Sequence, residues 1–136
     1  AEDGKIVKNI YKSAKIAAFT SDYFSDIPSI LSTSNLIISR AGSSTLNEII
    51  YYNKPSILIP YPHAVDDHQY FNAKVLEKYN GARIILDKEL TQAKIYLEIQ
   101  RIISLFKDRK YKISSNRQNL NASFQIYNFI EKDLCR

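Results

Sequence analysis

The stretch from Asn35 to Ala73 constrains the fold more than any other part of the chain. It reads NLIISRAGSSTLNEIIYYNKPSILIPYPHAVDDHQYFNA: an apolar run, a turn of small residues, a helical pattern, a second apolar run, a proline-stiffened loop and another helical pattern. Near-continuous apolar runs separated by a helix are typical of parallel strands joined by a crossover. We therefore expect two helix N-termini at one edge of a parallel sheet, where open α/β folds bind their ligands.

The remaining sequence extends this pattern in both directions. Short apolar runs predict strands, which are expected at Lys15–Thr20, Leu36–Ser39, Ser56–Ile59 and Arg83–Leu86. Amphipathic spacing predicts helices, which are expected at Asp22–Leu31, Ser44–Tyr52, Asp66–Tyr79, from Thr91 onward, and from about Ser115 to Lys132. Strands that alternate with helices predict an α/β fold, a Rossmann-like parallel sheet in three layers with helices on both faces.

The sequence before Lys15 differs from the start of a complete doubly wound domain. It contains one amphipathic segment, around Ile6 to Tyr11, and no glycine-rich turn between a strand and a helix. The chain also begins with alanine and contains no methionine. We therefore expect residues 1–136 to form a single but incomplete domain, whose sheet lacks its first strands.

Composition and charge exclude several classes of protein. With 136 residues, of which 45% are hydrophobic and 24% charged, the chain has the content of one globular domain rather than of a disordered segment. No apolar run approaches the roughly 20 residues that span a bilayer. The net charge of +5 is spread along the chain, so no nucleic-acid partner is expected. The single cysteine, Cys135, excludes an internal disulfide and a cysteine-based zinc site, which favours a reducing, cytoplasmic location.

A turn of small residues, RAGSST at positions 40–45, precedes the first of the two helices. Gly42 allows a tight turn and lets a ligand approach the backbone. The expected helix N-terminus offers unpaired backbone donors, a natural anion site, from Ser43, Ser44 and Thr45. These residues are also good helix caps, and Thr45 with Glu48 has the spacing of a capping box. The two interpretations are compatible, because a phosphate uses the amides that a cap leaves free.

The second loop, PYPHAVDDHQYFNA, gathers polar side chains at the start of the next helix. Two prolines hold its first part extended, and Asp66 or Asp67 is placed to cap the helix. Imidazole and amide groups that can bind sugar hydroxyls follow, on His68, Gln69 and Asn72. A metal site is the alternative, since two histidines and two aspartates occur between His63 and His68. Their spacing is not that of a helical histidine pair, so no metal ligand is predicted.

Glu48 lies one turn into the first of these helices. A carboxylate there can accept hydrogen bonds from both hydroxyls of a ribose, as acidic residues do in other nucleotide sites. An anion site, a ribose acceptor and groups that bind hydroxyls together predict a phosphorylated, hydroxyl-rich ligand. The sequence therefore indicates a nucleotide-sugar site.

Taken together, these motifs resemble a known family. The segments ISRAGSSTLNEI, KPSILIPYPHAVDDHQYFNA and GARIIL, in that order, are similar to the C-terminal domain of the MurG family of bacterial N-acetylglucosaminyltransferases, glycosyltransferase family 28. The likeness extends from about Ile16 to the C-terminus. It implies the C-terminal part of a two-domain GT-B fold and a UDP-N-acetylglucosamine donor, with no further cofactor.

The resemblance also implies roles for individual residues. Glu48 would bind the ribose hydroxyls, and the amides around Ser43 to Thr45, next to Gly42, would face the diphosphate and the sugar. The hydroxyls of N-acetylglucosamine would be contacted by His68, Gln69 and Asn72. Some family members have Gln where this chain has His68. No catalytic residue is assigned to this chain, because the family's N-terminal domain is expected to supply the base.

Two features of the family are missing from the chain: its Gly-Gly-Ser loop, and the N-terminal domain with the acceptor site and a membrane-facing patch. The resemblance therefore implies a donor-binding part that is inactive alone. A missing acceptor domain or partner chain would bring the lipid-linked muramyl-pentapeptide precursor of peptidoglycan, whose assembly underlies cell shape and division. The joined enzyme would lie on the cytoplasmic face of the inner membrane. Two alternatives stay open: the small donor-binding subunit of a two-chain lipid-linked N-acetylglucosaminyltransferase, and a non-catalytic nucleotide-binding module.

Overall fold

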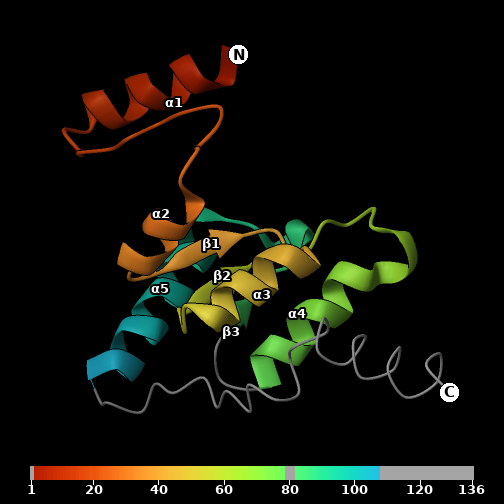
Figure 1. Cartoon of the computed structure of the whole chain (residues 1–136). Coiled ribbons are helices and arrows are strands. Elements are labelled where there is room, and N and C mark those ends of the chain that lie inside the picture. The colour runs from red at the N-terminus through yellow and green to blue at the C-terminus, as the bar shows by residue number, and fades with distance from the viewer. Residues whose placement is uncertain (1, 79–81, 108–136) are drawn as a thin grey trace, which may run out of the picture. The chain divides into compact units, whose positions relative to one another are not determined.

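The computed structural model describes residues 2–78 and 82–107 of the chain (Figure 1). The chain divides into two compact units, Ala1–Ile30 and Leu31–Arg136. The helix expected from about Ser115 to Lys132 lies outside the described residues.

The second unit is built on a parallel sheet of three short strands. In their order across the sheet, these are β1 (Ile37–Ser39), β2 (Ser56–Leu58) and β3 (Ala82–Ile84). The register places Ile38 beside Ile57, and Ile57 beside Arg83. The parallel α/β fold expected from the sequence is confirmed, and these three strands lie within two residues of their expected bounds.

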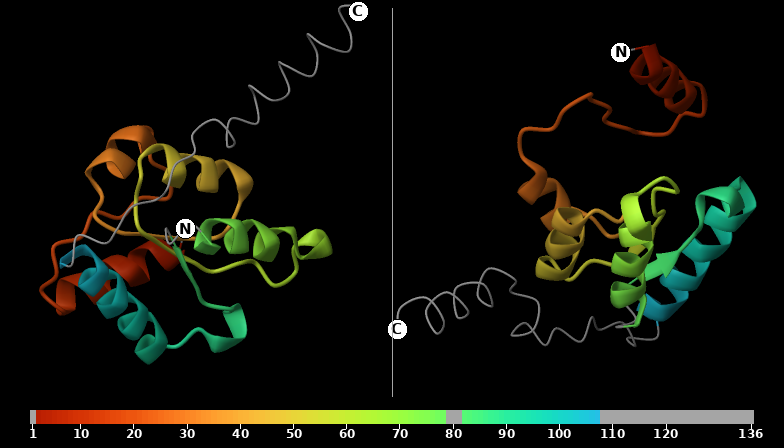
Figure 2. Two further views of the ribbon diagram at one scale, coloured as in Figure 1. Left: turned by 90° about the horizontal axis from the view of Figure 1, so that it is seen from below. Right: turned by 90° about the vertical axis from the view of Figure 1, so that its right-hand side faces the viewer.

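Helices cover both faces of this sheet, so that the unit has three layers (Figures 1 and 2). α3 (Ser43–Tyr51) and α4 (His68–Lys78) lie on one face, and α5 (Gln92–Lys107) lies on the other. Leu58 packs into the core beneath α3 and α4, whereas its neighbour Ile57 packs beneath α5; both side chains are fully buried. The need to fill two cores explains why β2 is apolar at successive positions.

The helices of the second unit begin close to their expected residues, except α4. α5 starts at Gln92, and the hydroxyl of Thr91 caps it by accepting a hydrogen bond from the Lys94 N–H at 3.1 Å. α4 was expected from Asp66 but starts at His68. A 3-10 turn (Val65–Asp67) takes the preceding positions, and its two aspartates both have φ of 51°. The left-handed backbone breaks the helical path, and Asp tolerates that conformation better than most residues.

The first unit contains α1 (Glu2–Ser13), which corresponds to the expected amphipathic segment. Lys15 ends this helix in a left-handed conformation, with φ of 55°, and the Ile16 N–H donates to the Tyr11 carbonyl at 3.0 Å. The strand predicted at Lys15–Thr20 is therefore wrong: Ile16 is 56% exposed and Phe19 is 82% exposed. An apolar run forms a buried strand only beside paired neighbours, and in the described residues this segment pairs with no strand.

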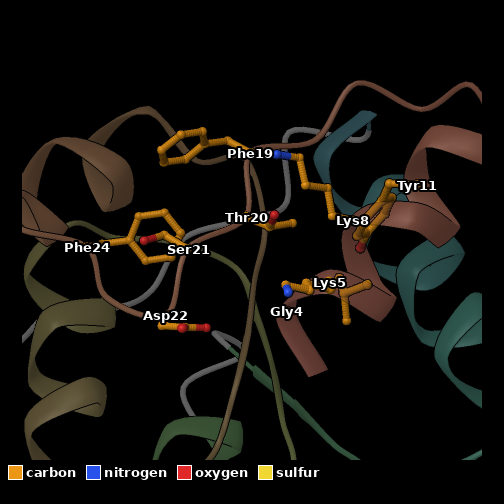
Figure 3. A pocket seen from close by; sticks show the side chains of 10 residues that line it. Gly4, Lys5, Lys8, Tyr11, Phe19, Thr20, Ser21, Asp22 and Phe24 are labelled. Atoms are coloured by element: carbon orange, nitrogen blue, oxygen red, sulfur yellow. The ribbon is translucent and has the colours of Figure 1, made fainter. Parts of the chain in front are cut away.

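A pocket with a volume of about 620 Å³ lies within the first unit, between α1 and the segment that follows it (Figure 3). Lys5, Lys8 and Tyr11 line it from α1, and Phe19 and Phe24, whose ring centroids lie 5.6 Å apart, line it from the segment. No residue that the sequence predicts to bind the ligand lines this pocket.

α2 (Ile27–Thr33) begins at Ile27 rather than at the predicted Asp22. Asp26 precedes it, and its Oδ1 accepts a hydrogen bond from the Ser29 N–H at 3.1 Å, which is the geometry of an N-cap. Pro28 falls in the first turn, where its missing N–H costs no helical hydrogen bond. The cap and the proline together place the start of the helix.

The Asp26 cap predicts a pH dependence of this helix end. Hydrogen bonds from Ser29 hold the pKa of Asp26 below its ordinary value. Because the folded pKa is depressed, the cap is fully formed above the ordinary pKa of an aspartate and is lost as the pH falls through the depressed value. We expect an NMR titration to show the Ser29 amide and the Asp26 carboxyl shifting together below that ordinary pKa. A midpoint at or above it would contradict the cap.

Candidate functional site

The turn between β1 and α3 presents free backbone donors at the carboxyl edge of the sheet. Gly42 is the N-cap residue of α3, and the first helical hydrogen bond runs from the Leu46 N–H to the Gly42 carbonyl at 3.0 Å. Among the residues that the structure describes, no side chain caps this end of the helix. Its first turn is therefore left with the amides of Ser43, Ser44 and Thr45, which is the arrangement that binds anions.

Gly42 does not serve the turn in the way predicted. Its φ of −68° and ψ of 144° are extended backbone that any residue adopts, so the turn does not require glycine. A Cβ built on Gly42 would meet no atom within 4 Å. Residues 2–78 and 82–107 thus leave the space above Gly42 open, and its role in admitting a ligand stays a prediction.

The predicted capping box does not form. Thr45 is the third residue of α3 rather than its cap, because the helix starts at Ser43. Glu48 therefore lies in the second turn, and its side chain is exposed to solvent. The N-cap, Gly42, lies three residues before the position that the box requires, so the Glu48 side chain does not complete a capping box.

The loop between β2 and α4 differs from the prediction at its two aspartates. An N-cap residue normally has extended backbone, whereas Asp67, directly before α4, has φ of 51°. The expected cap by Asp66 or Asp67 is therefore not supported. The hydrogen bond that braces this turn comes instead from His68, whose Nδ1 lies 2.7 Å from the Val65 carbonyl oxygen. Because a carbonyl only accepts, Nδ1 carries the proton there, and Nε2 is the ring nitrogen left for another partner.

The predicted sugar-binding side chains lie on the first turns of α4. The Oε1 atom of Gln69 accepts a hydrogen bond from the backbone N–H of Tyr61 at 3.0 Å. Gln69 therefore serves the loop with its oxygen and keeps its NH₂ group for a ligand. Asn72 follows one turn later and is half-buried. Since α3 and α4 pack against each other, the two predicted clusters lie on neighbouring helices that both begin at the carboxyl edge of the sheet (Figure 1).

Arg40 also lies at this edge, and none of the sequence motifs predicts a role for it. Its Nη1 atom lies 2.6 Å from Asp87 Oδ1, and 3.3 Å and 3.2 Å from the carbonyl oxygens of Ile59 and Pro60. Arg40 follows β1, Ile59 follows β2, and Asp87 begins a 3-10 turn (Asp87–Glu89) shortly after β3. The guanidinium of Arg40 thus links the segments that follow the three strands. A charged residue directly after a predicted parallel strand was the available signal in the sequence.

His63 lies on the same loop and is exposed, and its ring forms a T-shaped pair with that of Tyr61 at a centroid distance of 5.6 Å. In residues 2–78 and 82–107, no three or more His, Cys, Asp or Glu side chains come together as metal ligands would. Over the same residues, no helix combines the length and the apolar content needed to cross a membrane.

Residues 2–131 match the glycosyltransferase family 28 C-terminal domain. A relative from Caulobacter vibrioides (strain NA1000 / CB15N) is 33% identical over 135 residues, which cover 97% of this chain and 37% of the relative. A relative from Aquifex aeolicus (strain VF5) is 39% identical over 101 residues, covering 74% of this chain and 29% of the relative. Both are named UDP-N-acetylglucosamine--N-acetylmuramyl-(pentapeptide) pyrophosphoryl-undecaprenol N-acetylglucosamine transferase.

The fold is also similar to the crystal structure of Acinetobacter baumannii MurG. The TM-score is 0.67 at 26% identity, and the match covers 74% of this chain and 29% of that chain. Against these relatives the chain spans between 29% and 37% of their length. The matched domain, the identity across nearly the whole chain and the common fold agree with one another. The chain therefore belongs to glycosyltransferase family 28 and corresponds to its C-terminal domain.

Proposed function

We propose that this chain binds UDP-N-acetylglucosamine, as the donor-binding part of a transferase that adds N-acetylglucosamine to the lipid-linked muramyl-pentapeptide precursor of peptidoglycan. The observation that carries the proposal is the uncapped N-terminus of α3, with the amides of Ser43 to Thr45 beside an open Gly42. Unpaired N–H groups at the positive end of a helix dipole favour a phosphate group. The names of the relatives supply the donor and the acceptor.

The remaining groups of the site suit the rest of this donor. The exposed carboxylate of Glu48, further along α3, would accept hydrogen bonds from the ribose hydroxyls. The N-terminal turns of α4 would provide the groups for the sugar hydroxyls: Nε2 of His68, the NH₂ group of Gln69 and the side-chain amide of Asn72. Each has a donor or acceptor left once the hydrogen bonds within the loop are made.

The chemistry that fits this arrangement is an inverting transfer. A hydroxyl of the acceptor attacks the anomeric carbon of the donor, the bond from that carbon to the diphosphate oxygen breaks, and UDP leaves. The amides at the N-terminus of α3 would stabilise the charge that develops on the departing diphosphate, because they are oriented before the reaction begins. A base outside this chain would take the proton of the attacking hydroxyl.

The chain by itself is proposed to bind the donor without transferring the sugar. Transfer requires the acceptor and the base to be held against the anomeric carbon, and the proposal assigns both to an acceptor domain or partner chain. The assembled enzyme would then act on its lipid-linked acceptor at the cytoplasmic face of the inner membrane.

Calorimetric titration of the chain with UDP-N-acetylglucosamine, UDP and UDP-galactose tests this proposal. We expect binding of all three, with the N-acetylglucosamine donor bound most tightly. A folded chain that binds none of them at millimolar concentration would overturn the proposed donor site. Equal affinity for the two sugar nucleotides would show that α4 does not distinguish between the sugars. The proposed site would then be specific only for UDP.

Glu48→Ala is expected to weaken UDP-N-acetylglucosamine binding by about 1–3 kcal/mol, because the ribose hydroxyls lose their charged acceptor. Calorimetry on the folded variant measures this change. Since Glu48 is exposed and forms no capping box, the free energy of unfolding should change by less than about 0.5 kcal/mol.

Glu77→Ala is the matched control for this variant. Glu77 is a glutamate of α4 whose carboxylate pairs with Lys74 at 2.7 Å, and none of the groups proposed to bind the ligand contacts that pair. Its replacement should leave the affinity for UDP-N-acetylglucosamine unchanged. Equal affinities for the Glu48 variant and the unmodified chain would rule out the ribose role.

A further inference from the structure

We propose that Arg40 and Asp87 form a positioning pair that sets the loop of residues 59–61 and, through it, the side chain of Gln69. This inference rests on the proposed function, because Gln69 matters to the ligand only if α4 reads the sugar. Arg40 itself is not proposed to touch the ligand. It acts on the backbone that precedes the ligand-binding residues of α4.

Both hydrogens on Nη1 of Arg40 have hydrogen-bond acceptors. Nη1 carries two hydrogens, and it has a close partner in Asp87 Oδ1 at 2.6 Å and two longer ones in the carbonyls of Ile59 and Pro60 at 3.3 Å and 3.2 Å. One hydrogen serves the carboxylate, and the other is shared between the two carbonyls. Asp87 thereby orients the guanidinium that holds the loop, because the charged contact is the shortest of the three.

Gln69 also binds the backbone of this short loop. The Tyr61 N–H donates to Gln69 Oε1 at 3.0 Å, one residue beyond the carbonyls that Arg40 binds. The Tyr61 ring also faces Arg40, with the guanidinium carbon 5.7 Å from the ring centroid. The backbone of residues 59–61 is therefore bound by two side chains, one after β1 and one at the start of α4. If the Arg40 contacts were lost, the loop could shift and Gln69 would lose its fixed orientation.

The exposure of the pair indicates local positioning rather than a contribution to global stability. The side chains of Arg40 and Asp87 are 50% and 38% exposed. Ion pairs at such exposure add little to the free energy of unfolding. Lysine would not reproduce the arrangement, because its ammonium ends one bond closer to the backbone than Nη1 and sits on a flexible stem, whereas the planar guanidinium fixes the direction of Nη1.

Hydrogen exchange of the Tyr61 amide tests the pair directly. In Arg40→Lys and in Asp87→Asn we expect the protection of this amide to fall about fivefold, and the double variant should lose no more than Arg40→Lys alone, since the two residues act as one unit. Lys74→Gln is the matched control, because it breaks the ion pair to Glu77 on the outer part of α4 and should leave Tyr61 unchanged. Unchanged protection in Arg40→Lys would overturn the proposal.

Ligand affinity gives the functional arm of the experiment. Calorimetry should show UDP-N-acetylglucosamine bound about fivefold more weakly by Arg40→Lys, and UDP less than twofold more weakly, because only the sugar reaches α4. Asp87→Glu keeps the carboxylate, so it should lose less affinity for UDP-N-acetylglucosamine than Asp87→Asn. Equal losses for the two ligands would overturn the link to Gln69. An unmodified chain that binds neither ligand would defeat the proposed function, and the exchange measurement would then still decide whether the pair holds the loop.

Discussion

Ile57→Ala is expected to lower the free energy of unfolding by about 3 kcal/mol, among the largest single effects in the chain. Ile57 lies on the central strand with no exposed surface, and it packs with Ile85 and Ile102 in the core beneath α5. Truncation removes buried methyl and methylene groups and leaves a cavity, because strands paired on both sides cannot move to fill the space. Urea unfolding followed by circular dichroism measures the change.

The neighbouring isoleucine in the register provides the control. Ile38 pairs with Ile57 across the sheet and is 47% exposed. Ile38→Ala should therefore cost less than about 1 kcal/mol, since half of the side chain is already in water. Similar losses for the two variants would mean that the burial of the central strand does not dominate the stability of this unit.

Gly42→Val is expected to weaken UDP binding by about 2–3 kcal/mol while leaving the fold intact. The extended backbone of Gly42 suits a β-branched residue, and a Cβ there would meet no atom of the described part of the chain within 4 Å. A bound diphosphate would occupy that space, so the added methyl groups would push it away from one or two of the charge-assisted hydrogen bonds to the amides of α3. Calorimetry with UDP and with uridine separates this loss from any change at the base or the ribose.

The expected pattern is a loss of affinity for UDP with little change for uridine, which has no phosphate to displace. Gly42→Ala should give a smaller loss in the same direction. A valine variant that is folded and binds UDP as well as the unmodified chain would show that the diphosphate does not lie against Gly42. The N-terminus of α3 would then have lost its proposed part in the site.

Much of the second unit could be predicted from short-range patterns. β2 was recognisable because Ile57 and Leu58 are apolar in succession, and a strand between two helical layers must bury both of its faces. The start of α3 was predicted within one residue from the small residues that precede it. Because parallel strands all end at the same edge of a sheet, both helix N-termini were expected there.

Patterns that depend on a single turn were less reliable. Thr45 and Glu48 have the spacing of a capping box, but that spacing recurs inside helices, and the N-cap of α3 is Gly42, three residues before Thr45. Asp66 and Asp67 look like caps in the sequence, yet both take a left-handed backbone. In each case several short-range solutions are almost equal in free energy, and packing of the helix against the sheet selects one.

Sequence patterns were enough to predict the parallel α/β fold of residues 31–78 and 82–107 and the family. Tertiary structure alone decided whether Lys15–Thr20 is a strand, because an apolar segment forms one only beside a paired neighbour. It also decided the roles of Arg40 and Gln69, whose partners lie elsewhere along the chain. Periodicity reports how a residue relates to its neighbours in sequence, whereas a hydrogen bond between distant segments depends on how the whole chain is packed.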